Sequence, residues 1–104
     1  MDQTLIGIDI GTTGVKVAMF ATGGQLLASA YHTYDTTYPA PDHVEQRPDD
    51  WVDGTLAGLR DVTAQSGVDA GRIAGISFSG QMMGQVPISA DGTLLVDSIP
   101  IWAD

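Results

Sequence analysis

The chain has 104 residues, 43% of them hydrophobic, and a formal net charge of -9, because 13 acidic residues face only 4 lysines and arginines. This length allows one domain with a modest core. So acidic a chain is poorly suited to bind nucleic acid or an anionic membrane, since phosphate contacts need clustered positive charge. It has no cysteine and no apolar run long enough to span a bilayer, so we expect a cytoplasmic protein with neither type of partner.

An apolar strand, a turn of glycine and threonine, and a second apolar strand open the chain. We expect the strands at 4–10 and 15–20. Backbone N–H groups and the hydroxyls of Thr12 and Thr13 can gather around phosphate oxygens at such a turn, because glycine lets the main chain approach closely. Asp9, just before the turn, offers the hard carboxylate oxygen that Mg²⁺ prefers. The pattern therefore predicts a nucleotide-phosphate site on a β-hairpin. It is not a Walker A motif, because no G-x-x-x-x-G-K-[ST] is present.

A third strand and one helix are expected next. The third strand, at 26–34, completes an antiparallel meander, and a polar loop with two prolines follows it. Pro48 suits the first turn of a helix, and Gly67 suits its C-terminal cap. The residues that recur at helical spacing and should form the buried stripe are Val52, Leu56, Leu59 and Val62.

The last part of the sequence predicts a return to the sheet and a small hairpin. A largely buried strand at 72–79 should lie beside the first, and segments 86–88 and 93–96 should pair around the turn Asp91-Gly92. Together these elements predict an α/β fold with a mixed five-stranded sheet that one helix covers on one face only. A face left bare and an apolar Ile-Trp ending indicate the front portion of a larger protein.

Four segments match one known family in order and spacing. They cover 7–16, 45–51, 75–84 and 100–104, and read GIDIGTTGVK, EQRPDDW, GISFSGQMMG and PIWAD. The chain resembles the N-terminal part of the FGGY carbohydrate kinases, and most of all the xylulokinases. The first segment alone is typical of the wider actin-like ATPase superfamily, whose core is ribonuclease H-like; the four together are specific. The resemblance implies that residues 1–104 are an incomplete N-terminal domain, lacking the rest of domain I and all of domain II.

The resemblance also implies ATP and Mg²⁺ as cofactors and assigns roles to individual residues. Asp9 would organise Mg²⁺ and be needed for catalysis, while the catalytic base would lie in a later segment, outside this chain. The residues expected along the ATP phosphates are Thr12, Thr13, Gly14 and Lys16. Those expected around the sugar are Gln81, Met82 and Met83 on one side, with Trp102 and Asp104 on the other.

The implied activity is ATP-dependent phosphorylation of D-xylulose or a related ketose or polyol by the intact protein, with the isolated piece inactive. Xylulokinases usually show Gln-Met-His-Gly in the sugar loop, where this chain has Met83 in place of the histidine. A gluconate- or ribulose-type kinase of the same family therefore stays open. So does a non-catalytic, actin-like ATP-binding module, although such relatives lack a sugar pocket at this loop. A homodimer is compatible with the resemblance.

Several of these residues also allow simpler roles. Asp9 can be an Asx-turn residue that ends a strand, and Lys16 can point into solvent. Met82 and Met83 can fill gaps in a core, and Trp102 can be a core aromatic.

We assign the remaining residues of the second matching segment to structure. Glu45 and Gln46 are expected to support the fold rather than the chemistry. Trp51 is expected to pack the first turn of the helix.

Overall fold

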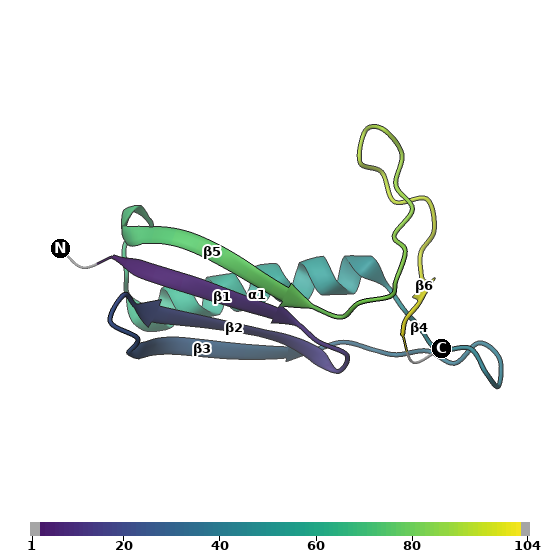
Figure 1. Ribbon diagram of the computed structural model, residues 1–104, viewed down its shortest axis with the longest axis horizontal. Coiled ribbons are helices and arrows are strands. Elements are labelled where there is room, and N and C mark those ends of the chain that lie inside the picture. Colours follow the sequence, from purple (N-terminus) through teal and green to yellow (C-terminus); the bar gives the residue numbers. More distant parts are fainter. Residues whose placement is uncertain (1–2, 103–104) are drawn as a thin grey trace.

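The computed structural model describes residues 3–102, which form a four-stranded sheet, one long helix and a second sheet of two short strands (Figure 1). Both helical elements begin after extended backbone, and β1 and β2 of the main sheet alternate between buried and more exposed side chains in their central part. The elements in chain order are β1 (Thr4–Ile10), β2 (Gly14–Ala21), β3 (Leu26–Thr33), β4 (Glu45–Gln46), α1 (Pro48–Ser66), the short 3₁₀ helix η1 (Ala70–Arg72), β5 (Ile73–Gly80) and β6 (Ile99–Pro100).

The main sheet has the strand order β3-β2-β1-β5. The first three strands form the predicted antiparallel meander, and β5 returns parallel to β1 after the α1 crossover. Alternate residues of β1 and β2 point toward α1 and make the core. The buried members of this cluster are Ile6, Ile8, Val15, Val17, Met19, Ala28 and Val62.

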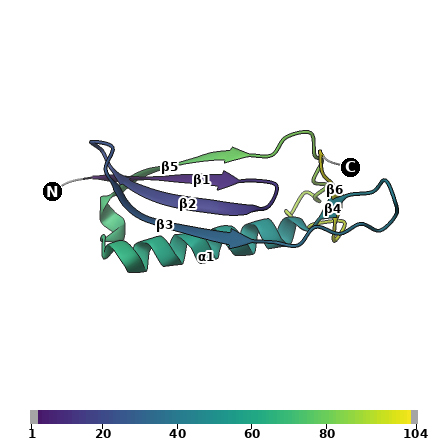
Figure 2. The ribbon, with the colours of Figure 1, turned by 90° about the horizontal axis from the view of Figure 1, so that it is seen from below.

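The helix α1 begins and ends where the sequence predicts. Arg47 is its N-cap and makes no side-chain capping bond, and Gly67 closes it with a φ of 66° and an N–H bond to the Thr63 carbonyl. Figure 2 shows α1 lying along β2 and β3 rather than across the whole sheet. Close packing is possible because Gly58 has no Cβ, which would lie 2.5 Å from Val17 Cγ2.

The predicted buried stripe of α1 is wrong in part. Val62 is fully buried and Leu59 packs against the core, but Val52 and Leu56 are 56% and 44% exposed. The helix instead approaches the sheet through Gly54 and Gly58, where a Cβ would lie 2.9 Å from Val15 Cγ1 and 2.5 Å from Val17 Cγ2.

Within residues 3–102 the main sheet has four strands rather than the predicted five. Segments 86–88 and 93–96 do not join it; they share a single bridge, between Ile88 and Leu94, in an arm that projects beyond the end of the sheet (Figure 1). Pro87 has no N–H with which to extend this pairing. The chain then returns to form β6, which pairs with β4 in the second sheet.

The strand β5 is also more exposed than expected. It is an edge strand of the described sheet, and Ile76 and Phe78 are 50% and 64% exposed because α1 covers the opposite edge. Among residues 3–102, no helix combines the length and the apolar character needed to cross a membrane.

Candidate functional site

The β1–β2 turn is closed by a bond of 3.0 Å from the Gly11 N–H to the Gly14 carbonyl. Asp9, at the end of β1, pairs in register with Lys16 on β2 and with Ser79 on β5. Its neighbours along the strand point into the core under α1, so Asp9 lies on the opposite, open face of the sheet. Asp9 and Lys16 are both exposed, and the predicted metal ligand and the predicted phosphate-binding cation are therefore adjacent on this face.

The loop at 81–84 begins directly beside this turn. The Gln81 N–H donates to the Ile10 carbonyl at 2.9 Å, which holds the end of β5 against the end of β1. Met82 and Met83 are 78% and 90% exposed, so neither is a core residue in the described structure. Met83 has a φ of 66°, which no other non-glycine residue of the described chain shares, and such strain is typical of ligand-binding loops.

One open hollow of about 400 Å³ brings the two predicted halves of the site together. Within it, Trp102 Nε1 donates to Thr12 Oγ1 at 2.8 Å, so the tryptophan predicted on the sugar side touches the turn predicted to bind phosphate. The residues around the hollow are Asp9, Gly11, Thr12, Gly80, Gln81, Met82, Met83 and Trp102.

The remaining predicted residues lie close to this hollow or outside the described residues. Thr13 is exposed at the tip of the turn. Gly14 is buried against the neighbouring strand β3, where a Cβ would lie 2.5 Å from the His32 carbonyl oxygen. Lys16 and Asp9 line a second, smaller hollow of about 310 Å³ on the open face. Asp104 lies outside the described residues.

The chemistry of Asp9 fits a magnesium ion held together with phosphates. Residues 3–102 contain no group of three or more histidine, cysteine, aspartate or glutamate side chains that could hold a metal ion by themselves. Mg²⁺ usually keeps several waters and takes one or two protein carboxylates besides substrate phosphates, so a single exposed carboxylate suffices. Asp9 would be that ligand in this part of the chain.

Two residues that the sequence left without a chemical role hold the turn from behind. Gln46 is only 1% exposed, and its Nε2 donates to the Thr12 carbonyl at 2.6 Å. The Tyr34 hydroxyl donates to the Gly11 carbonyl. Burial is the largest cause that raises the pKa of Tyr34 to about 12, and the nearby Tyr31 and Asp9 add to it. The Tyr34 hydroxyl therefore keeps its proton and stays a donor at neutral pH. A tyrosine in a strand-flanking segment carries no sequence signal for this role, while Gln46 belongs to a family-like segment.

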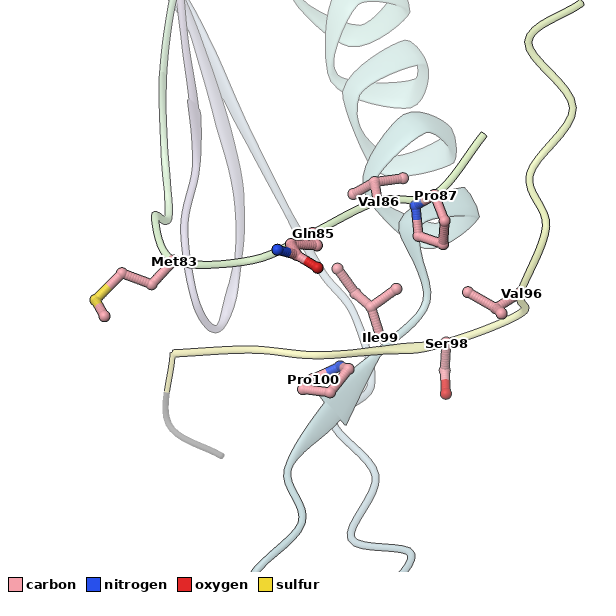
Figure 3. Close-up of a pocket in the computed structure, with 8 residues that line it drawn as sticks. All are labelled: Met83, Gln85, Val86, Pro87, Val96, Ser98, Ile99 and Pro100. Carbon is pink, nitrogen blue, oxygen red and sulfur yellow. The ribbon is translucent and has the colours of Figure 1, made fainter. Parts of the chain in front are cut away.

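A third and larger hollow, of about 590 Å³, lies beside the site (Figure 3). It is formed between segment 83–87 and segment 96–100 at the base of the projecting arm. Its lining includes Val86, Val96 and Ile99, and it reaches neither Asp9 nor the β1–β2 turn. Met83 lines both this hollow and the one that holds Trp102.

The family of this chain follows from a match to the N-terminal domain of the FGGY carbohydrate kinases, which extends over residues 4–104. The chain belongs to this family. It is 37% identical over 100 residues to a xylulose kinase of Bacillus subtilis (strain 168), covering 96% of this chain and 20% of the relative. It is 30% identical to a glycerol kinase of Citrifermentans bemidjiense (strain ATCC BAA-1014 / DSM 16622 / JCM 12645 / Bem), covering 98% of this chain and 21% of the relative.

Solved structures of a gluconate kinase and a xylulose kinase share the fold. A gluconate kinase from Lactobacillus acidophilus matches with a TM-score of 0.87 and 31% identity, over all of this chain and 20% of its own. A ligand-bound xylulose kinase from the same organism matches with a TM-score of 0.85 and 31% identity, over 98% of this chain and 20% of its own. The mixed α/β fold expected from the sequence is thereby confirmed. The chain spans about one fifth of the relatives that it matches.

Proposed function

We propose that the intact protein containing this chain transfers the γ-phosphoryl group of ATP to a hydroxyl of D-xylulose or a related ketose or polyol. Residues 1–104 would be the N-terminal part of its domain I, supplying the phosphate hairpin and one wall of the sugar pocket. The observation that carries this proposal is the single hollow in which Asp9 and Thr12 face Gln81 and Trp102. A cytoplasmic location and a homodimer stay predictions.

The phosphate side of the hollow offers what phosphoryl transfer needs. The transferred group must be held in line, and its charge must be neutralised by positioned donors and cations. The turn offers the backbone N–H groups and hydroxyls of Thr12 and Thr13, and Lys16 supplies a fixed positive charge on the adjoining strand. Mg²⁺, when bound, would neutralise phosphate charge next to Asp9. A turn fixed by two paired strands needs little reorganisation for this task.

The sugar side combines apolar surface with a few polar groups. Met82, Met83 and the half-exposed Trp102 present apolar and aromatic surface, against which the C–H faces of a sugar can pack. The Gln81 Oε1 has no hydrogen-bond partner within residues 3–102, but it is buried, so a sugar hydroxyl would reach it only if the loop at 81–84 moves on binding. Closure of a second lobe over this wall would exclude water and limit ATP hydrolysis.

A gluconate-type acceptor is the second candidate, because of two observations. Met83 stands where xylulokinases usually carry a sugar-contacting histidine, and a gluconate kinase is among the closely similar folds. A non-catalytic ATP-binding module finds less support, because the named relatives are sugar and polyol kinases.

The test is a coupled kinase assay of the intact protein across ketoses, polyols and sugar acids. Turnover with a ketose or polyol supports the proposal, turnover with a sugar acid alone supports the second candidate, and no turnover with any acceptor removes both. Asp9→Ala should lower kcat by about 100-fold or more, because a charge-stabilising group is lost. Asp69→Asn is the control, since this exposed carboxylate lies at the other end of the sheet. Full activity of Asp9→Ala would show that the metal role is misassigned.

A further inference from the structure

We propose that Gln46 is a positioning residue that fixes the phosphate-binding turn and couples it to the sugar loop at 81–84. This inference rests on the proposed kinase function. Gln46 is only 1% exposed, so it does not contact ATP or sugar directly. It acts through the two segments that border the hollow.

Every hydrogen-bonding group of the Gln46 side chain is used. Its Nε2 donates to the Thr12 carbonyl at 2.6 Å and to Thr36 Oγ1 at 2.8 Å. Its Oε1 accepts from Trp51 Nε1 and from Gln81 Nε2, both at 2.9 Å. An amide offers two donors and two acceptor lone pairs, and this site uses all four. A glutamate would place an oxygen against the Thr12 carbonyl oxygen, and a methionine would remove the bonds to all four partners.

The bonds to the turn determine which way its N–H groups point. In a trans peptide the C=O and the following N–H point in opposite directions. Gln46 holds the Thr12 carbonyl inward, so the Thr13 N–H is directed away from Gln46. In the same way, the Gly11 carbonyl accepts from Gln81 Nε2 at 3.3 Å and from the Tyr34 hydroxyl, which directs the Thr12 N–H away from them. The two carbonyls that face the interior therefore orient two N–H donors for phosphate.

The turn at 11–14 and the loop at 81–84 are coupled because Gln81 contacts both. Its Nε2 contacts Gln46 and the turn, while the loop that it begins forms the sugar wall. A displacement of this loop on sugar binding would be transmitted to the Thr12 carbonyl through one buried side chain.

Gln46→Met in the intact protein tests the positioning role, with Gln25→Met as a matched control on the exposed turn before β3. We expect the ATP KM to rise about tenfold and kcat to fall with it, because at least one buried hydrogen bond to the turn is lost. A merely structural role would lower the folded fraction, and so the apparent kcat, while leaving the ATP KM unchanged. Thr36→Val removes one anchor of Gln46 without touching the hollow, and should raise the ATP KM by a smaller factor even if Gln46→Met folds poorly.

Hydrogen exchange of the same variants tests the coupling without relying on activity. Gln46→Met should speed amide exchange in both the turn at 11–14 and the loop at 81–84, while Gln25→Met leaves both unchanged. Faster exchange in only one of these segments, or an unchanged ATP KM in a folded Gln46→Met and Thr36→Val, would overturn the inference. A wild-type protein that phosphorylates no acceptor would refute the proposed function instead, and the exchange pattern would still decide whether Gln46 links the two segments.

Discussion

Replacing Gly58 by alanine tests how closely α1 is packed on the sheet. The added Cβ would lie 2.5 Å from Val17 Cγ2 and 3.1 Å from Val17 Cβ, whereas carbon atoms in contact prefer about 3.5–4.0 Å. Val17 is 0% exposed and its strand is paired on both sides, so it cannot move aside. The helix must retreat by about 1 Å. Overpacking of this kind costs about 1–3 kcal/mol, and the better helix propensity of alanine returns up to about 1 kcal/mol.

We therefore expect Gly58→Ala to destabilise the α1–β2 contact by about 1–2 kcal/mol. Native-state hydrogen exchange in the intact protein measures this locally, and amides of α1 and β2 should exchange roughly 5- to 30-fold faster. Gly71→Ala is the matched control, because its Cβ would meet nothing closer than 3.7 Å and its backbone is not left-handed. Protection in Gly58→Ala equal to the wild type would refute the packing argument.

Three further substitutions probe the site. Gly14→Ala should weaken ATP binding and destabilise the hairpin by about 1–3 kcal/mol, because its Cβ would meet the His32 carbonyl oxygen at 2.5 Å; unchanged nucleotide affinity in calorimetry would contradict this. Tyr34→Phe removes the bond to Gly11 and should abolish an alkaline step in stability. The pKa of Tyr34 is raised from 10.0 to about 12, so its contribution to stability is fully present below pH 10 and is lost as the pH rises through 12. A pH series of thermal unfolding measures this loss. Met83→His should lower the KM for D-xylulose about tenfold through a new hydrogen bond, in a left-handed position that histidine tolerates better; an equal KM would point to another acceptor.

The elements with a local signal could be predicted from the sequence. Alternating apolar residues gave β1 and β2, and Pro48 and Gly67 gave the ends of α1. The pairing of β4 with β6 could not be predicted, because strands of two residues have no periodicity and lie more than fifty positions apart. The stripe of α1 was mistaken at Val52 and Leu56 because a glycine, which carries no hydrophobic signal, makes the closest contact with the sheet.

The site divides in the same way. Asp9 and Thr12 are recognisable because a carboxylate and hydroxyls around a glycine turn have a chemical meaning by themselves. Gln46 and Tyr34 act on the turn through carbonyls that lie 34 and 23 positions away, so no local pattern reveals these contacts. Both serve the turn from the buried side, where side-chain contacts depend on the completed fold.

The position of the site is a consequence of the sheet topology. Because β1 and β5 are parallel neighbours, Ile10 pairs in register with Gly80, and the chain leaves both strands at the same end of the sheet. The β1–β2 turn and the loop at 81–84 are thereby placed side by side, at the carboxyl ends of strands, where open α/β sheets bind their ligands. The crossover through α1 thus brings the two loops together by backbone topology alone, without any side-chain contact. In the proposed kinase the acceptor would be selected by the few groups placed there, and Met83 is the one by which this chain departs from the pattern expected of xylulokinases.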